Sequence, residues 1–504
     1  MRIEYLCHAS LAIETADARL VTDPWLEGPA YCGQWWLFPK PVDVGGAHDA
    51  DCVLVTHGHE DHLHVPTLDG LRRKERFLYP YTWYGGIGGF ARSLGFRNVE
   101  EAITGRAYSI APDTRVTYLA NNLDSILVIE SGGRVVIDVN DALHCHPAPV
   151  IDLFVATLKR RWPRVDTVFC GFGGASHFPN TIHLAGKDDA EVGRLREQLF
   201  VHNFCRIVAG LQPRVAVPFA ADFVLLDPHK LWINDVRFAR EQIPAYYDEH
   251  FGGNGPAPRI VPMYPGDVLD GDHLHALSPY RDELSDGGLE HLLPAQYARE
   301  LAEKRATEWL DEDDAAVIVD ELRRNVEERA ALVSREVLAH LAFTVRVTDI
   351  RDGGFIDVRF VEGRPVLERG DGERAESRLR VETTSRVLRY SFSGEWCGDV
   401  ITIGYGCEIF VADRAAIAER LDAACVRLLT RHPVASRHAR REPLRAARYF
   451  LHNPLTGRWA LARLRKGREL RRMYDSDLWL ARTKCEICQV CDLPLIDAAL
   501  AESL

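Results

Sequence analysis

The segment 57–62 gathers three histidines and one aspartate, in the order His-Gly-His-Glu-Asp-His. The apolar run Val53–Val55 leads straight into it, which predicts a buried strand that ends at the first histidine. Imidazoles at positions i and i+2 of an extended segment point the same way and can share one cation. The turn that Gly58 allows then brings Asp61 and His62 round to a second position. The spacing predicts a metal centre, and a histidine-rich surface loop is the weaker alternative.

Such a centre can support two kinds of chemistry. Two metal ions can share a bridging water and lower its pKa, which produces a hydroxide nucleophile. Reduced iron can instead bind dioxygen at open coordination positions. We expect His57, His59, Asp61 and His62 to be metal ligands, and Asp61 and His62 to act in catalysis as well.

The same pattern of ligands resembles the signature of the metallo-β-lactamase superfamily. The resemblance implies an α/β fold, an αββα sandwich, with an aspartate that bridges two metals at the end of a later strand. We assign that bridging role to Asp141, with Asp138 as the substitute, because both lie on or just after the predicted strand Arg134–Val139. Asp23, which follows another predicted strand, matches the aspartate that stands upstream of the metal loop.

Further matches resemble one family in particular, the CMP-N-acetylneuraminate hydroxylases. They fall in order over residues 5–235, and a weaker similarity continues to about residue 430. The resemblance implies a non-haem iron oxygenase that hydroxylates its substrate with electrons delivered from outside. The matching segments are residues 8–13, 23–30, 35–37, 62–63, 66–68, 173–176, 178–179, 211–214 and 218–220.

Two departures separate the chain from that family. The hydroxylases carry a Rieske iron–sulfur domain, which needs Cys-x-His and Cys-x-x-His pairs, and this chain contains neither. The later metal histidines of the superfamily are also absent, because residues 121–124 and 262–265 stand where they are expected. Fewer imidazoles and more oxygen ligands suit iron or manganese better than zinc. We expect Asp227 or His229 to complete the ligand set, and His144, His146, His177 and His183 are the further candidates.

His8 stands just before a predicted strand, in the first of the segments that match the hydroxylases. We expect it to face the site and to act in catalysis by contacting the substrate. A plain hydrogen-bonding role is the alternative.

The end of the chain carries two ambiguous features. Cys485, Cys488 and Cys491 could hold an iron–sulfur cluster or a zinc ion with a fourth ligand from elsewhere, or could simply pack in the interior. The stretch 427–472 is rich in arginine and could dock an acidic carrier protein or an electron-donor protein, or could be a solvated basic face.

Composition narrows the class of protein. The net charge of −12 argues against a nucleic-acid or membrane binder. Residues 1–5 contain an early acid and begin no long apolar run, and no run reaches the eighteen or so apolar residues that a membrane span needs. Scattered cysteines without an export signal are typical of reduced thiols. We therefore expect a cytoplasmic protein.

The order of predicted elements divides the chain of 504 residues into four parts. Short Val- and Ile-rich strands alternate with helices in residues 1–275, which we assign to the catalytic sandwich. Residues 276–342 are charged and have helical spacing, and predict a helical connector. Residues 343–430 predict a small α+β domain of four or five strands and a closing helix. Residues 431–504 form a basic C-terminal region with the cysteine cluster.

Taken together, these patterns favour a non-haem iron oxygenase, with two irons, acting on a small polar or carrier-linked metabolite. A metal-dependent hydrolase of the phosphodiesterase or lactonase type is the alternative, and its metals would be zinc or manganese. A degenerate fold kept only for binding is least favoured, because the segment 57–62 retains every ligand of the motif.

Overall fold

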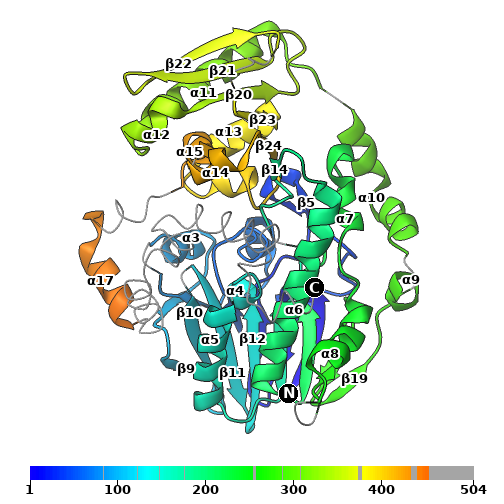
Figure 1. Ribbon diagram of the computed structural model, residues 1–504. Helices are drawn as coiled ribbons and strands as arrows, with labels where there is room; N and C mark the ends of the chain where they lie inside the picture. The colour runs from blue at the N-terminus through cyan, green and yellow to red at the C-terminus, as the bar shows by residue number, and fades with distance from the viewer. Residues whose placement is uncertain are drawn as a thin grey trace.

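The computed structural model describes residues 1–452, apart from 83–84, 122, 147, 175, 254–256, 286–287, 307, 373–376, 420 and 433–439. Two sheets packed face to face form the N-terminal part, and a third sheet with helices on one face forms the C-terminal part (Figure 1). The N-terminal part has the αββα metallo-β-lactamase architecture that the motif implies.

The first sheet has eight strands, in the order β19-β18-β1-β2-β3-β6-β7-β8. Its N-terminal strands pair antiparallel, whereas β3, β6, β7 and β8 run parallel. Helices α1, α2 and α3 cover its outer face. The strands are β1 (Arg2–Cys7), β2 (Ser10–Glu14), β3 (Arg19–Thr22), β6 (Cys52–Leu54), β7 (Arg76–Pro80), β8 (Asn98–Ala102), β18 (Val268–Asp270) and β19 (His273–His275), and the helices are α1 (Gly45–His48), α2 (Val65–Gly70) and α3 (Ile87–Ser93).

The second sheet has seven strands, in the order β17-β15-β13-β12-β11-β10-β9, and helices α5, α6 and α8 cover its outer face (Figure 1). Its strands are β9 (Ala107–Ser109), β10 (Thr114–Asn121), β11 (Asp124–Ser131), β12 (Arg134–Asn140), β13 (Thr167–Gly171), β15 (Val215–Phe219) and β17 (Arg259–Ile260). The helices on this side are α4 (Asp141–His144), α5 (Ala148–Arg161), α6 (Asp189–Leu211) and α8 (Ile243–Phe251).

Strand β11 shows why the sheets stack in this way. Successive side chains of a strand point to opposite faces. Leu127 and Ile129 therefore enter the core between the two sheets, while Ile126 and Val128 pack under the outer helices. All four are fully buried, so this strand is apolar on both faces, as a strand in the middle layer of a sandwich must be.

The predicted helical connector does not form a separate unit. Helices α9 and α10 pack beside a small three-stranded sheet on the sandwich, whereas α11 and α12 pack on the C-terminal sheet. The change in composition near residue 275 therefore does not mark a boundary between separately packed parts. That boundary lies between α10, which packs on the sandwich, and α11, which packs on the C-terminal sheet. These elements are β4 (Pro29–Ala30), β5 (Trp35–Leu37), β16 (Phe223–Leu225), α9 (Arg281–Ser285), α10 (Leu289–Arg305), α11 (Glu312–Ala330) and α12 (Arg335–His340).

The C-terminal sheet contains five strands from this part of the chain, where four or five were expected, and also β14, a strand from the N-terminal half. β14 pairs in parallel with β24, so the two parts share one sheet. The expected closing helix is divided into α14 and α15. The elements are β14 (Ile182–Leu184), β20 (Ala342–Val347), β21 (Phe355–Val361), β22 (Arg364–Gly370), β23 (Leu379–Thr383), β24 (Cys407–Val411), α13 (Ser385–Ser393), α14 (Arg414–Ala418) and α15 (Leu421–Leu429).

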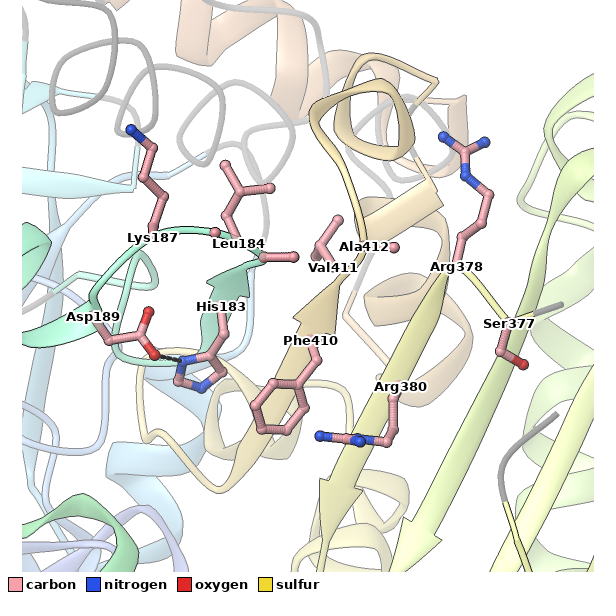
Figure 2. Close-up of a pocket in the computed structure, with 12 residues that line it drawn as sticks. His183, Leu184, Lys187, Asp189, Ser377, Arg378, Arg380, Phe410, Val411 and Ala412 are labelled. Atoms are coloured by element: carbon pink, nitrogen blue, oxygen red, sulfur yellow. Dashed lines mark hydrogen bonds and ion pairs between the residues drawn. The ribbon is translucent and has the colours of Figure 1, made fainter. Parts of the chain in front are cut away.

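A cavity of about 280 Å³ opens where β14 meets β23 and β24, as Figure 2 shows. His183, which lines it, bonds Asp189 at 2.8 Å and stacks on Phe410. The two arginines that line it are held by carboxylates, Arg378 by Asp413 and Glu419 and Arg380 by Glu382. The charges of these two arginines are therefore paired, and Lys187 is a third cation that lines the cavity.

None of the described helices is both long enough and apolar enough to cross a membrane.

The hairpin between β11 and β12 gives a test of the fold. Gly133 has φ +73° and a Cβ there would meet nothing within 4 Å, so Gly133→Ala should lose about 1 kcal/mol from left-handed backbone strain alone. Gly89 in α3 also has open space but no positive φ, so Gly89→Ala should be neutral or stabilising. Thermal unfolding of both variants checks this, and equal shifts in Tm would contradict it.

Candidate metal centre

The ligand-type side chains meet at one edge of the sandwich, where several strands end. Asp23 follows β3, the segment 57–62 follows β6, and Asp141 follows β12. His8 lies in the tight connection between β1 and β2, with φ +46°. Because both sheets present strand ends at this edge, residues far apart in sequence come together there.

The first group consists of His57, His59 and Asp141, whose ligand atoms all lie within 4.8 Å of one another. His57 Nε2 lies 2.8 Å from His59 Nδ1 and 3.9 Å from Asp141 Oδ2. Burial, with the neighbouring imidazoles of His62 and His59, lowers the pKa of His57 well below its usual range. His57 is therefore neutral, which is the form that binds a metal.

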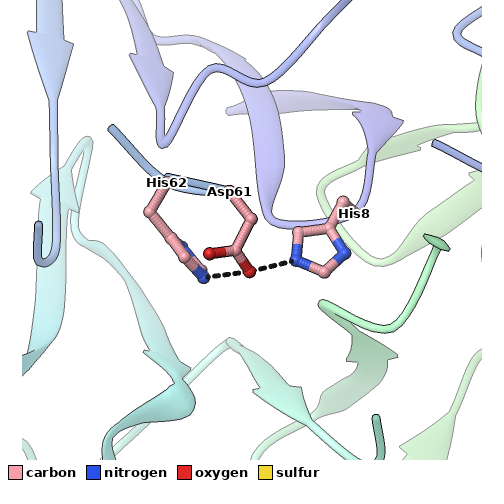
Figure 3. Close-up of side chains that lie close together, drawn as sticks. All are labelled: His8, Asp61 and His62. Carbon is pink, nitrogen blue, oxygen red and sulfur yellow. Dashed lines mark hydrogen bonds and ion pairs between the residues drawn. The ribbon is translucent and has the colours of Figure 1, made fainter. Parts of the chain in front are cut away.

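The second group consists of His8, Asp61 and His62, all buried (Figure 3). Asp61 Oδ2 lies between the two rings, 3.1 Å from His8 Nε2 and 3.3 Å from His62 Nε2. His8 thus belongs to a candidate ligand group. Its imidazole can take the place of one of the two later metal histidines that the sequence lacks. Its predicted contact with substrate remains a prediction.

The two groups adjoin through Asp141, whose Oδ2 lies 3.4 Å from His62 Nε2. Burial acts to lower the pKa of His62, but Asp61, Asp141 and Asp23 outweigh it and raise that pKa well above its usual range. His62 Nε2 is buried without a hydrogen-bond partner among the described residues. Several buried carboxylates around unpaired imidazole nitrogens form a donor set that fits divalent cations.

Asp23 orients the central histidine. Its Oδ2 lies 3.1 Å from His62 Nδ1, and it also accepts bonds from the Thr56 N–H at 2.7 Å and the Thr56 hydroxyl at 2.6 Å. The Asn140 amide donates to the same carboxylate. A carboxylate that holds the proton on Nδ1 leaves Nε2 as the nitrogen that gives up its proton when a metal binds, which is the usual support of a metal-binding histidine.

Tyr31 bonds Asp61 of the second group, and Glu60 in turn bonds Tyr31. The Tyr31 hydroxyl donates to Asp61 Oδ1 at 2.5 Å, while the Tyr31 N–H donates to Glu60. Glu60 in turn accepts a bond from the hydroxyl of Tyr390, in α13 of the C-terminal part. Burial raises the pKa of Glu60, and burial beside Glu60 raises the pKa of Tyr390.

Aromatic rings enclose His8. The ring centroid of Trp25 lies 5.3 Å from that of His8, Phe223 lies at 5.9 Å, and Trp35 at 6.4 Å. Trp35 and Phe223 are stacked, with centroids 3.6 Å apart. This wall keeps water from one side of the second group.

Asp124 stands beside the first group, with Oδ1 at 3.9 Å from His57 Nε2. It belongs to the segment 121–124, where the superfamily has a later metal histidine. A carboxylate is thus close to the position where an imidazole was missing.

The other candidates from the sequence are placed elsewhere. Asp227 accepts a bond from the His229 N–H at 3.1 Å and caps a short 3-10 helix, Pro228–Lys230, and His229 is exposed. His183 lines the cavity at β14. Within the described residues, neither metal-type group includes His144, His146 or His177. Cys485, Cys488 and Cys491 lie outside the described residues.

Asp138, the substitute for Asp141, lies within strand β12, and its side chain is buried. It is 1% exposed, and burial together with Asp23 raises its pKa well above the usual range. A neutral carboxyl is a poorer bridging ligand than the carboxylate of Asp141, which lies close to both His57 and His62.

Comparison with known proteins agrees with this architecture. Residues 2–141 match the family model described as Beta-lactamase superfamily domain. That segment contains β1 to β12 and both candidate ligand groups.

Curated relatives over a longer segment are cytidine monophosphate-N-acetylneuraminic acid hydroxylases. The protein of Danio rerio is 26% identical over 289 residues, which cover 53% of this chain and 46% of the relative. That of Mus musculus is 27% identical over 288 residues, 54% of this chain and 47% of the relative. An inactive Homo sapiens relative is 28% identical, covering 47% of this chain and 48% of its own. The chain thus spans about half the length of the curated relatives it matches.

Two solved structures illustrate the range of similar folds. CmlA, a diiron beta-hydroxylase from Streptomyces venezuelae, is 19% identical, with a TM-score of 0.36 over 53% of each chain. An isothiocyanate hydrolase from Delia radicum gut bacteria is 15% identical, with a TM-score of 0.38 over 54% of this chain and 99% of that one.

Replacing one histidine of each group should separate the two metal positions. We expect His57→Ala to lose the metal of the first group and His8→Ala that of the second, because each group then keeps only two ligands. Metal content per chain after dialysis measures this. His64→Ala is the control, since His64 is buried nearby and bonds Thr67 at 2.9 Å but belongs to neither group. It should keep both metals, and full metal content in His8→Ala would contradict the second group.

Asp141 and Asp138 provide a second test. Asp141→Asn should weaken both metals, because the carboxylate that adjoins both groups loses its charge. Asp138→Asn should keep the metals, because its neutral carboxyl is close in shape and charge to an amide. If Asp138→Asn alone reduces the metal content, the bridging residue lies three positions earlier than we assign.

Proposed function

We propose that the chain is a non-haem di-iron oxygenase that hydroxylates, or otherwise oxidises, a small polar or carrier-linked metabolite. The observation that carries the proposal is that each ligand group contains two histidines and one aspartate. Two histidines and one carboxylate, with other positions open, are the ligand set of many non-haem iron oxygenases. The likeness to hydroxylases over about half the chain supports the same reaction class.

In this proposal His57, His59 and Asp141 hold one iron, and His8, Asp61 and His62 hold the other. The bound irons would supply the activation of dioxygen. The protein keeps His62 in one orientation through Asp23, holds Asp61 through Tyr31, and excludes water on one side through Trp25, Trp35 and Phe223.

Hydroxylation places one oxygen atom of dioxygen in the substrate and reduces the other to water, which requires two electrons and two protons from a donor. We propose a separate electron-donor protein, because the chain contains no Rieske ligand pairs. The arginine-rich stretch 427–472 would suit docking of that donor or of an acidic carrier protein. The cysteines at 485, 488 and 491 are a further candidate route for electrons, through an iron–sulfur cluster, or a zinc site.

A metal-dependent hydrolase is the second candidate function. Two histidines and a carboxylate also bind catalytic zinc, which generates a hydroxide nucleophile. An ester of the phosphodiesterase or lactone type would then be the substrate.

Metal analysis with an optical spectrum distinguishes the two functions. For the oxygenase we expect about two irons per chain in protein purified without added metal, and a charge-transfer band. Dioxygen should be consumed when the reduced protein meets substrate and a chemical reductant. His57→Ala is the inactive control. Zinc in both positions, with ester hydrolysis and no dioxygen uptake, would reject the oxygenase in favour of the hydrolase.

A further inference from the structure

A chain of hydrogen bonds runs from the C-terminal part to the second ligand group. The hydroxyl of Tyr390 donates to one oxygen of Glu60, and the other oxygen of Glu60 accepts the Tyr31 N–H. The Tyr31 hydroxyl then donates to Asp61 Oδ1 at 2.5 Å. Three hydrogen bonds thus connect a helix of one part with a candidate ligand of the other.

The helix that carries Tyr390 is fixed firmly within the C-terminal part. Ser391, next in sequence, donates from its hydroxyl to the Leu429 carbonyl at 2.7 Å, which joins α13 to the end of α15. Arg389 Nε donates to Glu321 at 3.1 Å, which joins α13 to α11. Tyr390 therefore approaches the metal loop from a rigid platform.

The receiving segment has a strained backbone. Tyr31 and Cys32 both have positive φ, +52° and +58°, a conformation that side chains other than glycine adopt at some cost. Glu60 is the residue between the two histidines and Asp61 in the metal loop, and its carboxylate holds that strained turn in place. Without the Tyr390 bond, one oxygen of a largely buried carboxylate would lose its donor.

We propose that Tyr390 is a positioning residue for the second metal, acting through Glu60 and Tyr31 to hold Asp61 in its binding orientation. The proposal rests on the two-metal centre of the proposed function but not on the reaction it performs. It means that the metal loop binds its second ion fully only when the C-terminal part is seated against it.

The test is Tyr390→Phe in the full-length chain, titrated with cobalt(II) and followed by its visible spectrum. Outer partners of metal ligands typically contribute 10–100-fold to metal affinity, so we expect the second position to weaken by about that factor. The first position, which His57 and His59 dominate, should keep its affinity. Native affinity at both positions would overturn the proposal.

Tyr246→Phe is the matched control. It also removes one hydroxyl from a tyrosine, here a buried one that contacts His202 at 3.3 Å in the outer helical layer and belongs to neither ligand group. It should leave both cobalt affinities unchanged. An equal loss in this variant would show a general structural effect and would overturn the proposal.

The route through Glu60 is tested by a double variant. If Tyr390 acts only through Glu60, adding Tyr390→Phe to Glu60→Ala should change cobalt binding no further. Additive losses would overturn that route. Since cobalt affinity is measured without turnover, the positioning role can stand even if no dioxygen uptake is found, and the proposed oxygenase would then fail alone.

Discussion

The concentration of buried negative charge around His62 is the constraint on which the candidate centre depends. Asp23, Asp61 and Asp141 all approach this one ring, and the ring is fully buried. Carboxylates at such separations repel one another in a low-dielectric interior unless positive charge lies among them. The strand ends of two sheets must therefore be held together against this repulsion, which explains why so much of the surrounding packing is rigid and aromatic.

The sandwich supplies that rigidity because the loops that carry the ligands are attached to strands of both of its sheets. Strands buried on both faces, such as β11, cannot shift without exposing apolar surface on one side or the other. Loops attached to such strands are held in place by them, although several of the ligands in those loops are themselves buried.

Local sequence patterns predicted much of this architecture. The predicted strand Arg134–Val139 matches β12 within a residue, because an apolar β-branched run bounded by turns is typical of a buried strand. The apolar run Val53–Val55 likewise overlaps β6, the strand before the metal motif. The residues of the motif at 57–62 also lie in both candidate ligand groups, and their role as metal ligands stays a prediction.

Most long-range contacts of the site could not be predicted from the sequence. His8 was expected to face the site only through the family resemblance, and nothing local to Tyr390 indicates that it approaches the metal loop, since its partner lies hundreds of residues away. Asp227 and His229 had suitable side chains but the wrong surroundings, because they belong to a short capped turn. Suitable side chains that are neighbours in the sequence are thus a poor guide to a set of metal ligands that tertiary structure brings together.

Strand β14 has a consequence for how the chain can be assembled. Its hydrogen-bonding partner, β24, is synthesised more than two hundred residues later. Until then the backbone groups at the edge of β14 lack this partner, although the sandwich can already form. The pairing is a contact of very high sequence separation, which closes late and slowly. The two parts therefore share one sheet, and separating them would leave an unpaired strand edge on β14 and on β24.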